Sequence, residues 1–268
     1  DDEVKQEKIK YQLDALGHYM VLLKEEARLE KEGTKELVSD ISHQLKTPVA
    51  ALDTCFSVLL RENLSEEERK EFQVRCRCAL DGLEVLLQSL LQISKMEAGL
   101  IQINREKLPL METIIRAVNR VYPNAEAKEI EFVFDYDKAL ENDCILQDKK
   151  WLSEAFINVF DNAIKYSPAG SEVYVRIQKR TDFIRIEIED NGIGIPKVEY
   201  HKIFQRFFRG SLPEVKEENG SGIGLFLSRK IIEQHGGTIT VSSNLELKKE
   251  LDGKTGSVFI IQLPDNAK

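Results

Sequence analysis

A heptad repeat of apolar residues at the start of the chain constrains its fold more than any other feature. Between residues 9 and 41 these residues recur at alternating steps of four and three, interrupted by polar residues from Glu30 to Thr34. This period places one apolar stripe along a helix, and the stripe has to be covered. Packing on its own domain is the ordinary alternative, but nothing globular precedes the repeat. We therefore expect residues 1–35 to form a parallel coiled coil in a homodimer.

The same stripe continues through residues 36–61, and a second helix is expected after a short loop. Ser65 and Glu68 have the spacing of a capping box, which predicts a helix from Glu66 to about Glu97, ending at Ala98 and Gly99. Its apolar face would consist of Phe72, Leu80, Leu83, Leu87, Leu90 and Leu91. One helical hairpin cannot enclose a core, so we expect residues 36–99 to be a dimerisation domain that forms a four-helix bundle in the dimer.

Strand and helix signals alternate after Gly99 and predict an α/β sandwich over residues 100–268. The expected strands cover residues 101–103, 130–134, 173–177, 183–189, 238–241 and 257–263. The expected helices cover residues 109–127, 149–166 and 222–235, the second of them capped by Asp148. The predicted fold class of the whole chain is therefore α+β, with a helical hairpin followed by an α/β sandwich.

Composition narrows the classes of function. A net charge of −8 without a clustered positive face disfavours nucleic acid as a partner. No apolar stretch is long enough to cross a bilayer, and no signal peptide is recognisable. The cysteines lack the C-x-x-C spacing of a zinc site, so we expect reduced, partly buried thiols at Cys55, Cys76, Cys78 and Cys144.

The predicted helix over residues 149–166 carries the first candidate ligands. Asn158 and Asn162 lie one turn apart, and their carboxamide oxygens suit Mg²⁺ that is shared with nucleotide phosphates. Two solvated asparagines are the alternative if the pair stands alone. Lys165 and Tyr166 follow on the same helix, where an ammonium can approach a phosphate and a ring can border the nucleotide.

Two glycine motifs follow in a fixed order. Asp190 stands after a predicted strand and can accept the amino group of adenine, while Gly192 and Gly194 let the backbone approach the base. The second motif opens the predicted helix at residue 222, where backbone N–H groups and the helix dipole favour a phosphate. Its candidate nucleotide-binding residues are Gly220, Gly222, Gly224 and Leu225.

An aromatic segment lies between the two glycine motifs. Phe204, Phe207 and Phe208 precede a polar run over residues 210–219 that has little in the sequence to anchor it. An aromatic anchor beside such a run is typical of a mobile lid over a nucleotide, and we include Phe204 among the candidate binding residues. Core packing is the structural alternative for these rings, and both roles are compatible.

Together these motifs resemble the ATP-binding domain of the histidine kinase family, within the larger group shared with gyrase, the Hsp90 chaperones and MutL. Residues 158–166 resemble its asparagine box, 190–194 its first glycine box, 204–208 its phenylalanine box and 220–224 its second glycine box. Gly236-Gly237-Thr238 is similar to its closing glycine pair. The match covers nearly all of the chain after Gly99.

Residues 42–48, Ser-His-Gln-Leu-Lys-Thr-Pro, resemble the phosphoacceptor box of dimeric histidine kinases, usually Ser-His-Glu-Leu-Arg-Thr-Pro. His43 lies two positions from the seam residue Ile41 and should project toward solvent. Gln44 departs from the family pattern, because an amide cannot take the imidazole proton that a carboxylate accepts as general base. Thr47 lies one turn from His43, where the family orients water for dephosphorylation of the regulator. The implied catalytic residues are His43, Gln44 and Thr47.

The resemblance implies a dimeric sensor histidine kinase that uses ATP and Mg²⁺ to phosphorylate His43 and then transfers the phosphoryl group to a response regulator. It also implies the cytoplasmic domain of a sensor anchored in the inner or plasma membrane by a segment absent from this chain. Two alternatives remain open at this point. One is an ATP-binding signalling scaffold without phosphotransfer, which only Gln44 supports, and the other is a chaperone-like or topoisomerase-like ATPase.

Overall fold

The computed structural model describes residues 28, 35, 38–61, 63–97, 103–218, 220–243 and 256–265. The chain divides into two compact units, Asp1–Leu83 and Glu84–Lys268, with the division inside a long helix. The predicted coiled coil at residues 1–35 lies outside the described residues except for Arg28 and Lys35, which are both helical. None of the helices in the described part of the chain combines the length and hydropathy needed to cross a membrane.

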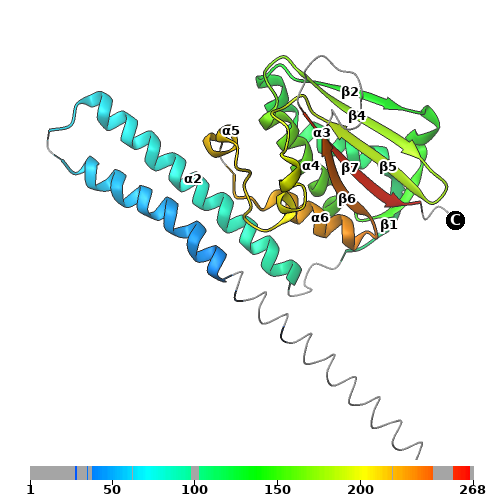
Figure 1. The fold of residues 1–268 in the computed structure, drawn as a ribbon, viewed down its shortest axis with the longest axis horizontal. Coiled ribbons are helices and arrows are strands. Elements are labelled where there is room, and N and C mark those ends of the chain that lie inside the picture. The colour runs from blue at the N-terminus through cyan, green and yellow to red at the C-terminus, as the bar shows by residue number, and fades with distance from the viewer. Residues whose placement is uncertain are drawn as a thin grey trace, which may run out of the picture. The chain divides into compact units, whose positions relative to one another are not determined.

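A helical hairpin forms the N-terminal part of the described chain (Figure 1). Its first helix includes residues 38–59 and continues through Pro48, and its second helix is α2 (Glu66–Glu97), with the bounds that the sequence predicts. The predicted capping box is confirmed, because Ser65 N donates to Glu68 Oε2 at 2.9 Å and Glu68 N donates to Ser65 Oγ at 3.2 Å. These hydrogen bonds from Ser65 lower the pKa of the Glu68 carboxyl group.

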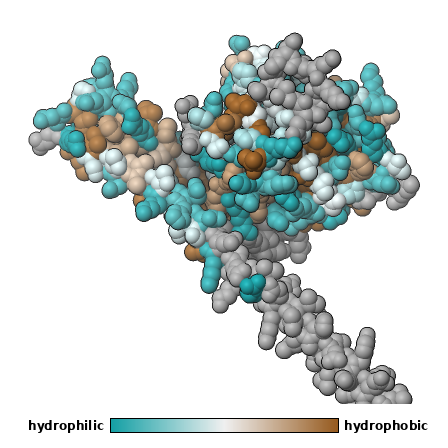
Figure 2. Space-filling model, in the orientation of Figure 1, coloured by the Kyte–Doolittle hydropathy of each residue, from teal (hydrophilic) through white to brown (hydrophobic). Residues whose placement is uncertain are grey.

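Within the first unit, each helix of the hairpin has one seam of partly or fully buried residues. The seam residues are Ile41, Gln44, Pro48, Leu52, Cys55 and Leu59 on the first helix and Arg69, Phe72, Cys76, Ala79 and Leu83 on α2. Figure 2 shows hydrophobic surface on the hairpin. The large apolar side chains that stay exposed there include Leu45, Val49, Phe56, Leu60, Val74 and Leu80. One hairpin therefore covers only part of its apolar surface.

The second unit is built on a five-stranded sheet with the order β2-β4-β5-β7-β6. The β2–β4 pair is parallel, and the other three pairs are antiparallel. The strands, all of which the sequence predicts, are β2 (Glu131–Tyr136), β4 (Glu172–Lys179), β5 (Phe183–Glu189), β6 (Thr238–Ser243) and β7 (Ser257–Pro264).

A separate two-stranded sheet was not predicted correctly. The expected strand at residues 101–103 is wrong at Ile103, its only described member, which lies outside any strand. The first strand is instead β1 (Glu106–Pro109), which pairs with β3 (Cys144–Gln147). The buried side chain of Gln147 in β3 supports the pairing with β1 at this position. Thr113 Oγ1 donates to Gln147 Oε1 at 2.8 Å, and Gln147 Nε2 donates to Leu108 O in β1 at 2.9 Å.

Three helices cover one face of the five-stranded sheet (Figure 1). They are α3 (Leu110–Ala127), α4 (Lys149–Tyr166) and α6 (Gly224–Gln234). The predicted cap of α4 is confirmed, since Asp148 Oδ1 accepts hydrogen bonds from Lys150 N at 3.1 Å and Trp151 N at 3.2 Å. Apolar residues of the helices and of the inward face of the sheet form one core, which includes Ile114, Phe156, Phe160, Ile186, Ile231 and Ile261.

Short elements complete the second unit. They are the 3-10 helices η1 (Lys138–Asn142), η2 (Lys197–Glu199) and η3 (Lys202–Phe204) and the short helix α5 (Pro213–Glu217). The helix expected at residues 222–235 is shorter than predicted, and its start at Gly224 follows from the positive φ of 69° at Gly222.

Candidate functional site

The two asparagines of α4 and their neighbours define one face of that helix. Asn162 Nδ2 donates to the backbone oxygen of Asn158 at 2.8 Å, which fixes the Asn162 amide with its oxygen as the remaining ligand atom. Asn158 Nδ2 is buried and has no hydrogen-bond partner among the described residues. Leaving a buried amide group unpaired costs about 1–3 kcal/mol, so this position is better explained as part of a binding site than as a core position.

Both glycine motifs approach this face of α4. A Cβ on Gly192 would lie 2.7 Å from the backbone oxygen of Tyr166, and a Cβ on Gly220 would lie 3.1 Å from Lys165 Nζ. A Cβ on Gly224 would lie 3.2 Å from Asn158 Oδ1. The structure therefore brings the asparagine helix and the two glycine motifs together, with glycine at each point of close approach. Their contact with a nucleotide stays a prediction.

Asp190 lies directly after β5 and is only 5% exposed. Its Oδ1 atom accepts hydrogen bonds from Gly192 N at 2.9 Å and Ser257 N at 3.0 Å. Burial raises the pKa of the Asp190 carboxyl group to about 6, although the two backbone hydrogen bonds act in the opposite direction. The sequence did not indicate Ser257, at the start of β7, as a site residue, because only the pairing of β5 with β7 brings it beside Asp190.

The second glycine motif turns sharply before α6. Gly222 has a φ of 69°, and a Cβ there would lie 2.6 Å from the carbonyl carbon of Phe207 and 2.8 Å from the backbone oxygen of Phe208. Gly194 in the first motif also has a positive φ, of 74°. These glycines are therefore required by backbone conformation, and Gly222 also by close packing against the aromatic segment.

Lys165 is the cation of this face. Its Nζ lies 5.3 Å from the centroid of the Tyr166 ring. Burial lowers the pKa of the Lys165 ammonium group, while the carboxylate of Glu218 raises it and the charge of Arg209 lowers it again. Burial is likewise the main cause that raises the pKa of the Tyr166 hydroxyl group. A partly desolvated ammonium group beside a glycine loop is suited to an anion such as a phosphate.

The polar run at residues 210–219 was expected to have little to anchor it, and this expectation is wrong for its described part, residues 210–218. The run contains α5, and the Arg209 guanidinium donates hydrogen bonds to the backbone oxygens of Val215 and Glu218. Glu199 is 7% exposed, and its Oε1 accepts a hydrogen bond from Ser211 N at 3.2 Å. Arg209 is the last residue of the aromatic segment, directly before the polar run. This position in the sequence was the signal that could have indicated Arg209 as the anchor of the run.

Two of the predicted binding residues belong to the hydrophobic core. Phe204 is 5% exposed and lies in the main core cluster, with the Arg229 guanidinium 5.8 Å from its ring centroid. Leu225 in the first turn of α6 is half-buried and packs against the same cluster. Core packing is thus established for both side chains, and nucleotide contact remains a prediction.

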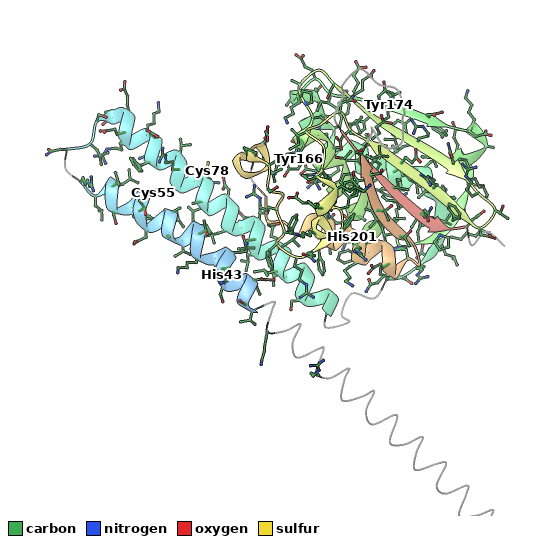
Figure 3. All side chains as sticks on the ribbon, in the orientation of Figure 1. His43, Cys55, Cys78, Tyr166, Tyr174 and His201 are labelled. Carbon is green, nitrogen blue, oxygen red and sulfur yellow. The ribbon has the colours of Figure 1, made fainter. Side chains whose placement is uncertain are left out.

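The predicted phosphoacceptor residues lie on the first helix of the hairpin, where Figure 3 labels His43. His43 and Thr47 are exposed and Gln44 is half-buried, so the predicted projection of His43 toward solvent is confirmed. Pro48 has no N–H group to donate to the Gln44 carbonyl four residues earlier, although the helix continues through it. The catalytic roles of these three residues stay predictions.

Two family models match the chain. Residues 34–99 match the His Kinase A (phospho-acceptor) domain, and residues 147–267 match the histidine kinase-, DNA gyrase B- and HSP90-like ATPase family. The phosphoacceptor match contains His43, and the ATPase match contains both glycine motifs and α4.

Known proteins with similar sequences are sensor kinases. The sensor protein kinase WalK of Staphylococcus aureus is 32% identical over 249 residues, which cover 91% of this chain and 57% of WalK. The sensor-like histidine kinase SenX3 of Mycobacterium tuberculosis is 32% identical over 244 residues, covering 89% of this chain and 55% of SenX3. The chain thus spans a little over half the length of these curated relatives.

Solved structures that resemble this chain include histidine kinases. A mycobacterial sensor histidine kinase, MprB, is 32% identical with a TM-score of 0.52, and the match covers 59% of this chain and 97% of that one. The histidine kinase ThkA, solved in complex with a response regulator protein, has a TM-score of 0.68 at 23% identity, and the match covers 90% of this chain and 66% of that one. The likeness to ThkA concerns the fold alone.

Proposed function

The chain belongs to the sensor histidine kinase family, and from this premise we propose that it is an ATP-dependent protein-histidine kinase. ATP bound beside α4 phosphorylates His43, and the phosphoryl group then passes to an aspartate of a response regulator. One observation carries the proposal: a single chain holds an exposed histidine in a phosphoacceptor domain and a helix face on which two glycine motifs converge.

In the proposed reaction an unprotonated imidazole nitrogen of His43 attacks the γ-phosphorus of ATP. A nitrogen–phosphorus bond forms, the bond to the β–γ bridging oxygen breaks, and ADP leaves with that electron pair. The half-buried amide of Gln44 can accept a hydrogen bond from the imidazole and fix its tautomer, but it cannot take the proton, which passes to solvent. Thr47 is assigned to positioning water in a phosphatase reaction on the regulator.

The adenine end of the nucleotide is assigned to the first glycine motif. The carboxylate of Asp190 accepts a hydrogen bond from the adenine amino group. The backbone N–H groups of Gly192 and Ser257 fix the orientation of this carboxylate. Because a Cβ at Gly192 would contact both Tyr166 O and Asp190 Oδ1, glycine keeps this wall of the site close to the base.

The phosphate end is assigned to α4 and the second glycine motif. Lys165 supplies positive charge beside Gly220, and the start of α6 presents backbone N–H groups beyond Gly222. Arg209 and Glu199 hold the segment from residue 210 to residue 218, which we assign as the described part of the lid. Lid closure positions the phosphates and excludes water from them.

The amide groups of Asn158 and Asn162 fit a magnesium ion that is shared with the phosphates. Asn162 offers Oδ1 because its Nδ2 is already bonded to the helix backbone, and the buried amide of Asn158 lacks a partner among the described residues. Rotation of that amide by half a turn would exchange its nitrogen and oxygen. When bound, Mg²⁺ would neutralise phosphate charge during transfer.

A homodimer follows from the apolar surface of the hairpin. Leu45, Val49 and Phe56 are between 37% and 59% exposed on the first helix and recur at helical spacing. A second hairpin that covers this stripe forms a four-helix bundle, which buries the stripe as one hairpin alone does not. The response regulator and a membrane anchor outside this chain complete the proposed assembly, in which this chain lies on the cytoplasmic side.

Autophosphorylation with ATP labelled at the γ-phosphate tests the proposal. Wild type should acquire an acid-labile, base-stable label, and His43→Ala should acquire none while it still binds nucleotide. His201→Ala is the matched control, because His201 is also exposed but lies in the second unit (Figure 3), and it should label normally.

The other outcomes of this experiment separate the alternatives. Label that persists in His43→Ala would contradict the assigned acceptor. Steady release of inorganic phosphate without labelled protein would identify an ATPase instead. Nucleotide binding with neither label nor phosphate release would identify a signalling scaffold, and failure to bind adenine nucleotides would overturn the assignment of the α4 site.

A further inference from the structure

The helix α4 ends abruptly, and its last carbonyl groups need hydrogen-bond donors from outside the helix. Ser167 follows Tyr166 in an extended conformation, with φ −86° and ψ 147°, so the helix stops at Tyr166. The helical donor for the carbonyl of Ile164 would be the N–H group four residues on, but that residue is Pro168, which has none. The carbonyls of this last turn therefore depend on another part of the molecule.

Lys128, at the end of α3, supplies these donors. Its Nζ donates to the backbone oxygen of Lys165 at 2.7 Å and to the backbone oxygen of Ile164 at 3.2 Å. The side chain of Lys128 is half-buried. A positive charge at the carboxyl end of a helix also interacts favourably with the helix dipole. The Lys128 ammonium group therefore caps α4 from a neighbouring helix.

The backbone around Lys128 fixes the origin of this side chain. α3 ends in a Schellman motif, in which Ile130 N donates to Ala125 O at 2.9 Å and Glu129 has a φ of 55°. The backbone oxygen of Lys128 accepts a hydrogen bond at 2.9 Å from the N–H group of Gly170, in the turn that follows α4. Lys128 thus binds the last turn of α4 through its side chain and the next turn of the chain through its backbone.

The capped turn carries groups assigned to both ends of the nucleotide, and this step rests on the proposed function. A Cβ on Gly220 would lie 3.1 Å from Lys165 Nζ, and a Cβ on Gly192 would lie 2.7 Å from the backbone oxygen of Tyr166. The last turn of α4 therefore meets the second glycine motif through Lys165 and the first through Tyr166. A shift of this turn displaces both groups, and nucleotide affinity depends on their placement.

We propose that Lys128 is a positioning residue for ATP, which fixes the last turn of α4 so that Lys165 meets the phosphates and Tyr166 borders the base. It acts through the backbone of α4 and is not itself a nucleotide ligand. Without its ammonium group, two carbonyls at a half-buried position lose their donor, and the turn has to move toward water to satisfy them.

Autophosphorylation of the whole chain at graded ATP concentrations tests this role. Lys128→Met keeps the length of the side chain but removes its charge and donors, so KM for ATP should rise at least about fivefold while kcat stays within about twofold of wild type. A purely structural role predicts the opposite pattern, because an unfolded fraction lowers kcat and leaves KM unchanged. Lys128→Arg keeps both charge and donors and should return KM to within about twofold of wild type.

Lys179 offers a matched control in the same unit. This lysine of β4 is ion-paired with Asp143 at 2.6 Å and with Asp265 at 3.0 Å. Lys179→Met removes a paired ammonium group of the same kind without touching α4, and KM for ATP should not change. An equal rise of KM in Lys179→Met would show that ATP affinity responds to any such loss in the sandwich, and it would overturn the proposal.

A measurement on wild type tests the cap without any variant. The protein is acetylated with an amine-reactive reagent, and modified lysines are quantified by mass spectrometry over time. Lys128 should react at least about tenfold more slowly than Lys138, an exposed residue of η1, because its amine must first leave the two carbonyls. Equal rates would show that the carbonyls do not hold Lys128 and would overturn the proposal.

The kinetic outcomes separate this inference from the proposed function. Unchanged KM in Lys128→Met, or a raised KM that Lys128→Arg does not reverse, would overturn the role of Lys128 while wild type still binds ATP and labels His43. Wild type that neither binds ATP nor acquires label would overturn the proposed function, and the role of Lys128 in ATP binding with it.

Discussion

Replacement of Gly222 by alanine should damage both the stability of the sandwich and its nucleotide site. An L-residue in the left-handed region costs about 1–2 kcal/mol. The added Cβ would lie 2.6 Å from the carbonyl carbon of Phe207 and 2.9 Å from Phe207 Cα, and relief of such contacts typically costs about 1–3 kcal/mol. Alanine also reduces the entropy of the unfolded chain, which returns about 0.4–1 kcal/mol. We therefore expect a net loss of about 2–4 kcal/mol.

Gly170 provides a matched control for this substitution. Its φ of 72° is close to that of Gly222, but a Cβ there would have no atom within 4 Å. Gly170→Ala therefore carries the conformational cost alone and should lose about 0.5–1 kcal/mol after the gain from the unfolded chain. Gly82, in the middle of α2 with open space around it, is the opposite case, and alanine there should stabilise its helix by about 0.5–1 kcal/mol.

Urea unfolding of the three variants measures these free energies, and titration with an adenine nucleotide measures binding. Gly222→Ala should lose at least about tenfold in affinity, because the phosphate-facing loop must shift to clear Phe207, whereas Gly170→Ala should bind as wild type does. Equal losses of stability in Gly222→Ala and Gly170→Ala would refute the argument from close packing. Normal nucleotide affinity in Gly222→Ala would refute the assignment of this loop to the phosphates.

Nucleotide affinity should fall as the pH drops through about 6, because a protonated Asp190 no longer accepts a hydrogen bond from the adenine amino group. Calorimetric titration with nucleotide on both sides of that pH measures the change, and an affinity that does not vary with pH would contradict the assignment. Gln44→Glu should increase the rate of His43 labelling at least about tenfold by supplying a general base, and no gain would show that the amide does not limit the reaction. The contribution of His235 to the stability of the sandwich should be lost as the pH falls below about 6.5, because burial lowers the pKa of His235 and the unfolded chain binds the proton first. The raised pKa of Asp190 acts in the opposite direction, so the loss due to His235 is the difference between wild type and His235→Gln. Urea unfolding at several pH values measures this loss, which should be smaller in His235→Gln if the hydrogen bond from Asp148 N to His235 Nε2 requires the neutral ring.

Elements with strong local signals were predictable from the sequence. The bounds of α2 follow from the Ser65–Glu68 capping box, and those of α4 follow from the cap at Asp148 and the apolar period after it. The strands β4 and β5 were recognisable because buried β-branched residues alternate along them. In these segments local propensity and tertiary packing favour the same structure.

Elements that depend on distant partners were not predictable. β3 is four residues long, and Gln147 is buried in it through hydrogen bonds to Thr113 and Leu108, which are remote in sequence. The anchoring of residues 210–218 depends in the same way on Arg209 and on the buried carboxylate of Glu199. A polar run has no periodicity that would reveal such contacts.

The candidate site was likewise predictable only in part. The residue types of its motifs were evident from the sequence, but the geometry that joins them was not. That Gly192 approaches Tyr166 and Gly224 approaches Asn158 follows only from the packing of α4 against β5 and α6. Ser257 became part of the Asp190 environment through the β5–β7 pairing, which no local pattern specifies.

Location of the phosphoryl group on the chain is the most direct test of the central claim. The protein is incubated with ATP and Mg²⁺, quenched at alkaline pH, digested and sequenced by mass spectrometry under conditions that preserve phosphoramidates. The account predicts a phosphoryl group on the peptide that contains His43, bonded to its imidazole. A phosphoryl group found only on another residue, or unmodified His43 in protein shown to bind ATP, would contradict it.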